Sequence, residues 1–480
     1  MTLASLAQAG REPAVPCSLR LGGAELIIDA WLRVLPGQRY VGRGVWKGRA
    51  VLAKLLVGPR AAKAYARERA GARSIVEAGM PTAPLLDDGW QDGEGGWLLF
   101  AFLEQAESLW DAWRRHEAEP CLSPAQRDVL GEALTLVAQM HRQGIWQDDL
   151  HLDNLLRADG RLHVIDGGGV HAERAGAPLS AERAAKNLAV FFAQLPAAVD
   201  DHIPRLLEPY RQANPVHALD AQALRAEVRR VRQWRLRDYL KKAGRDCSLF
   251  SVERGAQGLR AVRRVDLQRF GALLDDPDAL MARAVRLYKD GNTATVACVP
   301  HDGQPLLLKR YNIKGLGHWL KRFWRPSRAW HSWIEGQRLG FLGIGTARPI
   351  AVRESRCCWL RGRAWLVTEF LEGHDAIAAF EPYLDNAPPE KQLNALEQLF
   401  AALVRERISH GDLKGHNLMW TGEHWALIDL DAMRQHRSDT RFARAYARDR
   451  ARFLRNWPRE SALYRLLDAR LPKDSLRPEA

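Results

Sequence analysis

The chain has 480 residues and a formal net charge of +14. This length exceeds one ordinary hydrophobic core and predicts two domains, while 46% hydrophobic and 27% charged residues are typical of a folded globular protein and exclude extended disorder. The positive charge favours an anionic partner, which leaves nucleotides, nucleic acids and acidic membrane surfaces open.

The cysteines and the N-terminus indicate the compartment. Six cysteines show no CxxC spacing, which disfavours a zinc site or a disulfide framework and fits a reducing environment. The N-terminus has no basic residue before Arg11, and the best apolar run, residues 188–199, is broken by Gln194 and Pro196. We therefore expect a cytoplasmic protein without a membrane span.

The first half begins with short apolar and β-branched runs, which predict strands as far as WLLFAFLE, residues 97–104. Lys54 lies inside one of these runs, VLAKLLV. Longer helical patterns follow, and one of them has Ser123 as a candidate N-cap, Pro124 in the first turn and Gly144 as a stop. Strands followed by helices predict an α+β fold.

A polar loop follows this helix. The stretch QDDLHLDN places Asn154 five residues after Asp149, and Asp166 follows the next apolar runs. The number of residues between Asp149 and Asp166 is enough for a loop, a strand, a turn and a returning strand. This arrangement would bring the two carboxylates together. Asp and Asn alone are also common turn formers.

The second half repeats this order. The basic segment 230–244 is predicted to be a surface helix, and beyond it Lys309, Asp412, Asn417 and Asp429 recur in the same sequence, with equal spacing between the two aspartates. A period of this length is that of a whole domain. We predict two tandem domains, residues 1–238 and 239–480, and the repetition makes simple turn formation a poor explanation of either motif.

The repeated residue types suit phosphoryl transfer. This reaction needs a cation for the phosphates, oxygen ligands for Mg²⁺ and a carboxylate that accepts the proton of the attacking hydroxyl. The candidates are Lys54 and Lys309 for the phosphates, Asp149 and Asp412 as catalytic carboxylates, and Asn154, Asp166, Asn417 and Asp429 as Mg²⁺ ligands.

HGDLKGHN followed by LID, with an upstream strand lysine, resembles the catalytic and metal-binding loops of the protein-kinase-like fold. More narrowly, LLLKRYN and GIGTARP, with VLAKLL, AGMPTAP and WQDDLHLDN in the first half, resemble the lipopolysaccharide core kinases (InaA-like, Kdo and heptose kinases). The resemblance implies two domains, each with a β-rich N-lobe and a helical C-lobe. It also implies ATP and Mg²⁺ as cofactors, and phosphorylation of heptose or Kdo hydroxyls of the lipopolysaccharide inner core, or of a lipid-linked sugar, at the inner face of the cytoplasmic membrane.

Several positions depart from the pattern. Gln147 replaces the motif histidine, and Asp431 stands where the second half would have the glycine of Asp-Phe-Gly. The helix partner of the strand lysine is predicted to be Glu68 in the first half and Glu335 in the second. Residues 41–48 and 288–296 are candidate phosphate loops, although neither matches GxGxxG.

Other interpretations stay open. A small-molecule or aminoglycoside-type phosphotransferase would have the same fold. A protein kinase is disfavoured because no Ala-Pro-Glu segment follows either metal-binding aspartate, and one or both halves could be non-catalytic binding modules. Residues 315–325 combine an aromatic arc with Lys321, Arg322 and Arg325, which is typical of an interfacial helix and equally of a packed one. Nucleic acid is disfavoured because no recognisable binding module contains the aromatic residues.

Overall fold

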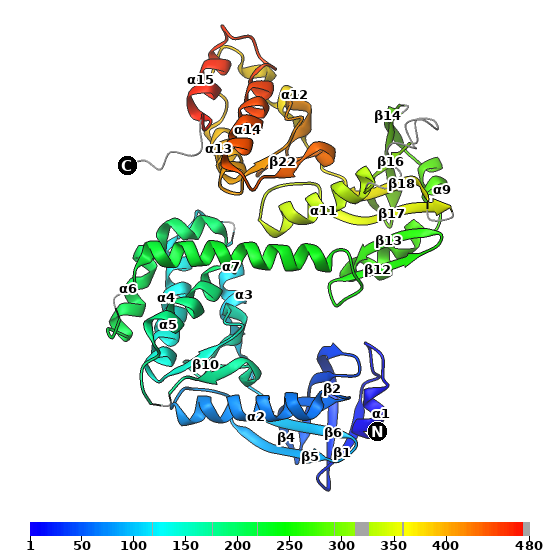
Figure 1. The fold of residues 1–480 in the computed structure, drawn as a ribbon. Helices are drawn as coiled ribbons and strands as arrows, with labels where there is room; N and C mark the ends of the chain where they lie inside the picture. Colours follow the sequence, from blue (N-terminus) through cyan, green and yellow to red (C-terminus); the bar gives the residue numbers. More distant parts are fainter. Residues whose placement is uncertain are drawn as a thin grey trace. The chain divides into compact units, whose positions relative to one another are not determined.

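A computed structural model describes residues 1–117, 119–174, 176–217, 219–291, 293–312, 326–357 and 360–473. The chain divides into two compact units, Met1–Trp234 and Arg235–Ala480, and each is described by itself (Figure 1). The division falls within helix α7 (Ala221–Lys242), so the basic segment predicted as a helix is helical.

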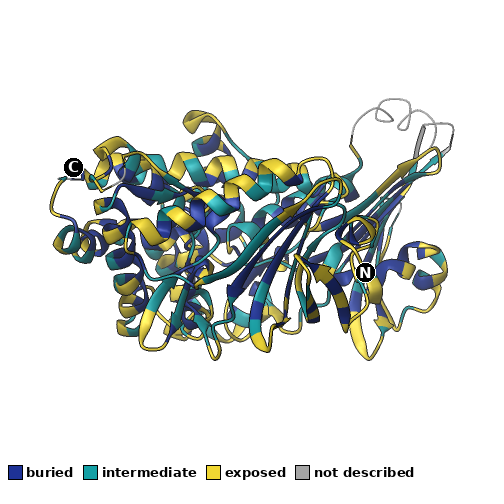
Figure 2. Ribbon diagram, turned by 90° about the horizontal axis from the view of Figure 1, so that it is seen from below, coloured by how far each residue is buried: buried dark blue, intermediate teal, exposed yellow. Residues whose placement is uncertain are grey.

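The first unit begins with an antiparallel sheet in which the lysine strand is central. The strand order is β1 (Cys17–Leu21), β2 (Ala24–Leu35), β3 (Arg39–Trp46), β4 (Arg49–Val57), β6 (Gly95–Ala101) and β5 (Leu85–Gln91). Burial alternates along β1, so one face of that strand packs inward. Figure 2 shows that the strands are largely buried and that exposed residues gather mainly at their ends and turns. Helix α1 (Leu3–Ala7) covers one face and helix α2 (Ala61–Glu77) the other. The sheet therefore holds Lys54, on β4, between two neighbouring strands.

The rest of the first unit is mainly helical. Helix α4 (Pro124–Arg142) provides much of its buried core. Ser123 is its N-cap and accepts a hydrogen bond from Gln126 N, and Gly144 follows the helix with φ of 79°, as the sequence predicts. The remaining elements are β7 (Glu107–Ser108), α3 (Leu109–Arg114), β8 (Ile145–Gln147), η1 (Leu152–Asn154), β9 (Leu155–Ala158), β10 (Arg161–Val164), η2 (Gly167–Gly169), β11 (Val170–Ala172), α5 (Ala181–Phe192), η3 (Ala197–His202) and α6 (Ile203–Ala213).

A buried ion pair fixes the first part of α7 to this core. Arg232 is 8% exposed, and its Nη1 lies 2.5 Å from Asp200 Oδ2. Its Nη2 donates to the carbonyl oxygens of Phe192 and Leu195. The guanidinium thus has a partner on each side, which a buried charge requires.

The second unit also begins with an antiparallel sheet. Its order is β12 (Phe250–Gly255), β13 (Gly258–Arg263), β17 (Pro349–Cys357), β18 (Leu360–Glu369), β16 (Gln304–Tyr311), β15 (Ala294–His301) and β14 (Arg286–Asp290). Helix α11 (Arg328–Phe341) packs on one face through Trp333, and α9 (Pro277–Ala282) with neighbouring short helices packs on the other. Lys309 lies on β16, between β15 and β18.

Helices again follow the sheet, and Phe400, Phe442 and Phe453 are central to their core. The other elements of the second unit are η4 (Arg264–Asp266), α8 (Leu267–Phe270), η5 (Gly271–Leu274), β19 (His374–Asp375), α12 (Ala376–Phe380), η6 (Glu381–Tyr383), α13 (Glu390–Arg405), β20 (Ile408–Ser409), η7 (Gly415–Asn417), β21 (Leu418–Trp420), β22 (Trp425–Leu427), η8 (Leu430–Ala432), β23 (Arg434–Gln435), α14 (Asp439–Leu454) and α15 (Ala462–Arg470). The α+β class predicted from the sequence is confirmed.

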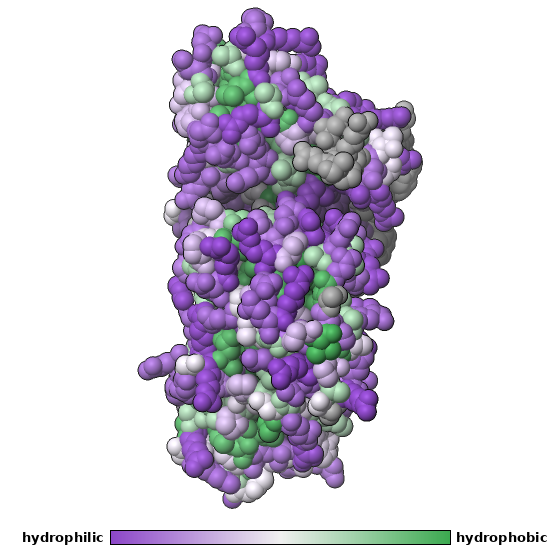
Figure 3. All heavy atoms as spheres, turned by 90° about the vertical axis from the view of Figure 1, so that its left-hand side faces the viewer, coloured by the Kyte–Doolittle hydropathy of each residue, from purple (hydrophilic) through white to green (hydrophobic). Residues whose placement is uncertain are grey.

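The surface drawn in Figure 3 is predominantly hydrophilic, with hydrophobic residues in small separate areas. Within the described ranges, no helix has both the length and the apolar character needed to cross a bilayer.

Candidate active site

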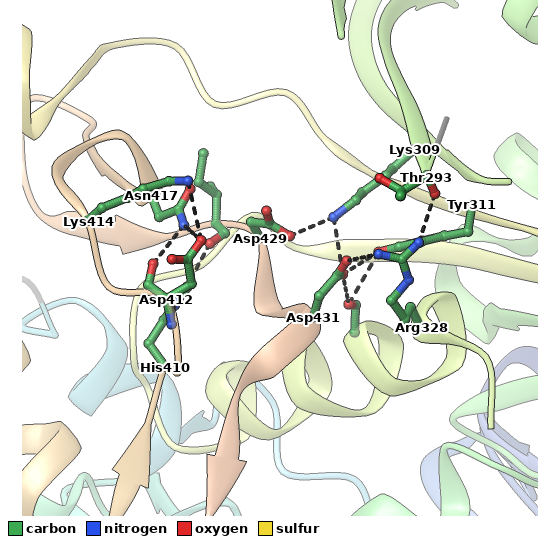
Figure 4. A network of polar contacts seen from close by, with 12 residues as sticks. Thr293, Lys309, Tyr311, Arg328, His410, Asp412, Lys414, Asn417, Asp429 and Asp431 are labelled. Carbon is green, nitrogen blue, oxygen red and sulfur yellow. Dashed lines mark hydrogen bonds and ion pairs between the residues drawn. The ribbon is translucent and has the colours of Figure 1, made fainter. Parts of the chain in front are cut away.

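The second unit brings its strand lysine to the turn after β22. Lys309 Nζ lies 2.6 Å from Asp429 Oδ1 and 3.1 Å from Asp431 Oδ1 (Figure 4). Asp429 has φ of 58°, a left-handed conformation that aspartate tolerates better than most residues, and it is the residue before η8. Burial alone would raise the pKa of Asp429, but the Lys309 ammonium outweighs burial and holds that pKa below its usual value. Asp429 is therefore a carboxylate at neutral pH.

A buried histidine joins the loop of Asp412 to the strand that precedes Asp429. His410 Nε2 donates to the carbonyl oxygen of Ile428 at 2.9 Å, and His410 is 0% exposed. Burial lowers the pKa of His410, so the ring stays neutral and keeps this geometry. The predicted loop and the predicted metal ligand are thus held together, as Figure 4 shows.

Asn417 is fixed in the same loop. Its Nδ2 donates to the carbonyl oxygen of Asp412 at 2.8 Å, and Ile428 N donates to the Asn417 carbonyl oxygen at 3.0 Å. This use of Nδ2 leaves the amide oxygen of Asn417 as the atom that could contact a metal ion. Among the described residues, no group of three His, Cys, Asp or Glu side chains could hold a metal. One carboxylate and one amide oxygen fit Mg²⁺, which commonly takes few protein ligands and completes its shell with phosphates and water.

The Asp412 carboxylate lies at the open side of the loop. It is 42% exposed as a side chain, and Arg452 Nη1 and Lys414 Nζ lie 3.0 Å and 3.3 Å from its two oxygens. Asp449, which is 4% exposed, accepts hydrogen bonds from Gly411 N at 2.9 and 3.1 Å. The sequence does not signal Arg452 and Asp449, because both come from α14 and only the fold brings them to the loop.

A cavity of about 610 Å³ lies beside Lys309, Asn417, Asp429 and Asp431. Its lining also includes the apolar side chains of Val296, Leu307 and Leu366 from the sheet, those of Ala347 and Ile428 outside it, and the basic residues Arg328 and Lys414. An apolar wall beside a cationic and carboxylate end suits a ligand with a flat ring and an anionic tail.

The first unit has a similar lysine cluster. Lys54 Nζ lies 2.8 Å from Glu68 Oε2 and 2.7 Å from Asp166 Oδ1, and Lys54 is 6% exposed. Arg39 Nη1 lies 3.4 Å from Glu68 Oε1. Burial would raise the pKa of Asp166, but the Lys54 ammonium outweighs it and keeps that pKa low. The pairing of Lys54 with Glu68 is the one expected from the pattern.

Gln147 makes the contact that His410 makes in the other unit. Its Nε2 donates to the carbonyl oxygens of Ile165 and Asp166 at 2.9 and 3.0 Å, and the side chain is buried. Asn154 Nδ2 donates to the Asp149 carbonyl oxygen at 2.9 Å. The Asp149 side chain is 70% exposed. An amide can thus brace this loop in place of an imidazole.

Two threonines fasten the strand that leads to each of these aspartates. Thr82 Oγ1 donates to the carbonyl oxygen of Val164 at 2.7 Å, and Thr346 Oγ1 donates to that of Leu427 at 2.8 Å. Each acceptor lies two residues before the aspartate. These threonines lie in the stretches AGMPTAP and GIGTARP, but the sequence alone does not show that they hold the strands.

The predicted pairing of Lys309 with Glu335 is wrong. Glu335 is 5% exposed on α11, and its partner is Arg338, with Arg338 Nε 2.7 Å from Glu335 Oε2. Glu335 lies about one helical turn beyond Ser332, the residue of α11 that reaches the lysine cluster. Asp431 provides the carboxylate instead.

The candidate phosphate loop of the first unit is also corrected. Residues 41–48 lie on β3 and the turn after it, whereas the turn before β3 contains Gly37. The glycines allow close strand packing, because a Cβ atom at Gly44 would collide with the carbonyl oxygen of Ile27 on β2. In the second unit, residues 288–296 span the end of β14 and the start of β15. The segment predicted as an interfacial helix lies outside the described residues.

A strand lysine, a loop with Asp and Asn, and an aspartate after the next strand pair define a protein-kinase-like site. Residues 319–462 match the model of the lipopolysaccharide kinase (Kdo/WaaP) family, so the resemblance seen in the sequence is confirmed for this region of the second unit. A solved structure titled "WaaP in complex with acyl carrier protein" is similar at 21% identity and a TM-score of 0.33, over 43% of this chain and 88% of that chain. No curated protein sequence matches the chain.

Proposed function

We propose that the protein is an ATP-dependent phosphotransferase that acts on a sugar hydroxyl of the lipopolysaccharide inner core, and that both units are kinase-like domains. One observation carries the proposal. In each unit the strand lysine contacts the aspartate suited to Mg²⁺, at 2.7 Å for Lys54 and 2.6 Å for Lys309, while a buried side chain ties that aspartate's strand to the loop of Asp149 or Asp412. The family match of residues 319–462 supports the acceptor class.

In this proposal each residue has a defined part. Lys309 binds nucleotide phosphates, and Asn417 and Asp429 present oxygen atoms to Mg²⁺, which would neutralise phosphate charge when bound. Asp412 Oδ orients the acceptor hydroxyl and holds its proton after transfer. Lys54, Asn154, Asp166 and Asp149 take these parts in the first unit. Transfer of labelled γ-phosphate from ATP to isolated lipopolysaccharide tests the acceptor, and transfer to aminoglycosides or protein alone would favour the alternatives.

Lys54→Ala and Lys309→Ala are each expected to weaken Mg·ATP binding at one site only. Both ammonium groups are held by carboxylates at the place where phosphates would lie, so each variant loses one charge-assisted contact, for roughly a 10- to 100-fold loss of affinity. Isothermal titration calorimetry of the full chain should resolve two sites in the parent and one altered site in each variant.

Lys391→Ala is the matched control, because Lys391 is an exposed lysine on α13 and does not line this cavity. A single site that survives both Lys54→Ala and Lys309→Ala would contradict the assignment of two nucleotide sites. Binding that disappears only with Lys309→Ala would make the first unit a non-catalytic module.

We also propose peripheral association with an anionic membrane surface. The support is the net charge of +14, the cluster of Lys321, Arg322 and Arg325, and exposed arginines on or beside α14 at positions 437, 441, 444, 448 and 455. Each basic residue near such a surface contributes about 1 kcal/mol, which falls with salt.

Co-sedimentation with phosphatidylglycerol-containing vesicles at low salt tests this association. Replacement of Lys321, Arg322 and Arg325 by Gln should weaken binding about 100-fold if all three act near the surface. The Arg441→Gln, Arg448→Gln variant is the comparison for α14. Binding that neither set alters would contradict the proposed association.

A further inference from the structure

The two strand lysines receive their second carboxylate from different elements. In the first unit it is Glu68, on α2. In the second unit it is Asp431, in η8, and the helix α11 places Ser332 rather than a glutamate beside it. The incorrect prediction of Glu335 and the glycine that Asp431 replaces therefore concern one place in the structure.

Two observations show that the positions correspond. Gly168 lies two residues after Asp166, as Asp431 lies two residues after Asp429, and a Cβ atom at Gly168 would collide with Glu68 Oε1. In the second unit the equivalent contact is made by Asp431, whose Oδ1 accepts a hydrogen bond from Ser332 Oγ at 2.8 Å. In the first unit the helix carries the carboxylate and the turn carries the small residue, and in the second unit the helix carries the small residue and the turn carries the carboxylate.

The helix register agrees. The same number of residues separates Glu68 from Thr82 as separates Ser332 from Thr346, and both threonines donate to the carbonyl oxygen two residues before the metal-ligand aspartate. Ser332 therefore stands at the position of Glu68.

The second unit also has more support for its carboxylate. The Tyr311 hydroxyl donates to Asp431 Oδ1 at 2.6 Å, and Arg328 Nη1 lies 3.7 Å from Asp431 Oδ2 (Figure 4). Arg328 also donates to the carbonyl oxygen of Thr293 at 2.8 Å. These contacts fix Asp431 from α11 and from β16, so its carboxylate has a defined place beside Lys309.

We propose that Asp431 is the positioning residue for Lys309, in the place that Glu68 takes for Lys54, and that a unit accommodates a carboxylate at only one of the two facing positions. This proposal rests on the proposed function for the part that Lys309 plays. Two carboxylates at these positions would repel each other and would also collide, which explains why the glycine is lost where the helix glutamate is lost.

An exchange of the two residues tests the proposal. The variants are Asp431→Gly, Ser332→Glu and the double variant with both changes, all in the full chain carrying Lys54→Ala. Each is compared with the chain that carries Lys54→Ala alone, so that a change in binding is assigned to the second site. Asp431→Gly should weaken Mg·ATP binding roughly 10- to 100-fold, because the ammonium loses a charge-assisted contact. The double variant should return to within about threefold of the parent, a rescue that a purely structural role of Asp431 would not give.

Thermal unfolding without nucleotide gives an independent measurement. Ser332→Glu alone should lower the Tm of the second unit by several degrees, because it adds a second carboxylate, and Asp431→Gly in the same chain should restore most of the loss. If the parent binds no Mg·ATP, the proposed function is rejected. The unfolding measurements would then still test whether both facing positions can carry a carboxylate. The proposal that the carboxylate can occupy either position would be overturned if the double variant binds Mg·ATP as weakly as Asp431→Gly or unfolds at a temperature as low as Ser332→Glu.

Discussion

Asp412→Asn is expected to reduce γ-phosphate transfer by ~10²–10⁴-fold, the range associated with loss of a general base. The carboxylate lies at the open side of the loop, away from Lys309, so affinity for Mg·ATP should change little. Asparagine keeps the size of the side chain, and the backbone carbonyl that holds Asn417 is unaltered. The measurement is labelled phosphate transferred to lipopolysaccharide, together with calorimetric affinity for nucleotide.

Asp149→Asn is the corresponding change in the first unit, and mass spectrometry of the product should show a different missing phosphate. Asp385→Asn, at an exposed position outside the loop, is the control for loss of one carboxylate. Full transfer by the Asp149→Asn, Asp412→Asn double variant would reject the kinase assignment. Transfer lost with Asp149→Asn and unaffected by Asp412→Asn would reject the second unit's part in it.

Arg232→Met is expected to destabilise the first unit by ~3–5 kcal/mol, since it leaves the Asp200 carboxylate buried without its partner. It also removes the donor for the carbonyl oxygens of Phe192 and Leu195. Urea unfolding of the full chain, monitored by fluorescence and circular dichroism, should show that the first unit unfolds at a lower urea concentration. The transition of the second unit should be unchanged.

Arg229→Met is the matched control, because Arg229 is exposed on the same helix. The double variant Arg232→Met, Asp200→Leu should recover much of the lost stability, as replacing a buried ion pair by apolar residues is often nearly neutral. Equal destabilisation by Arg229→Met and Arg232→Met would show that the buried pair contributes nothing specific.

The sequence predicted the residues that are close in the chain or that repeat in order. Lys54, Glu68 and Asp166 meet as expected, because a period-two strand, a helical pattern and a returning strand constrain where they lie. Lys309 and Asp429 meet for the same reason. Each of these contacts can be predicted from the local pattern of strands and helices and from their order along the chain.

The sequence failed where a contact depends on tertiary packing. Glu335 is the nearest acidic residue on the expected helix, but the choice between neighbouring helix positions depends on how α11 rotates against the sheet. In the sequence Asp431 appears only as the replacement of a glycine, because Ser332, the residue that faces it, carries no charge that would signal the contact. Asp449 reaches Gly411 from a separate helix, and nothing near either residue in the sequence links them.

The origin of the lysine contacts determines which motions can uncouple them. Glu68 and Asp166 approach Lys54 from a helix and from a distant turn, so a displacement of α2 would release one of the two carboxylates. Asp429 and Asp431 approach Lys309 from a single turn, so a displacement of α11 would remove the Ser332 and Arg328 contacts of Asp431, while the Tyr311 hydroxyl on β16 would still hold that carboxylate. Helix movement can therefore take a carboxylate away from the lysine of the first unit, whereas in the second unit it removes only part of the support of Asp431.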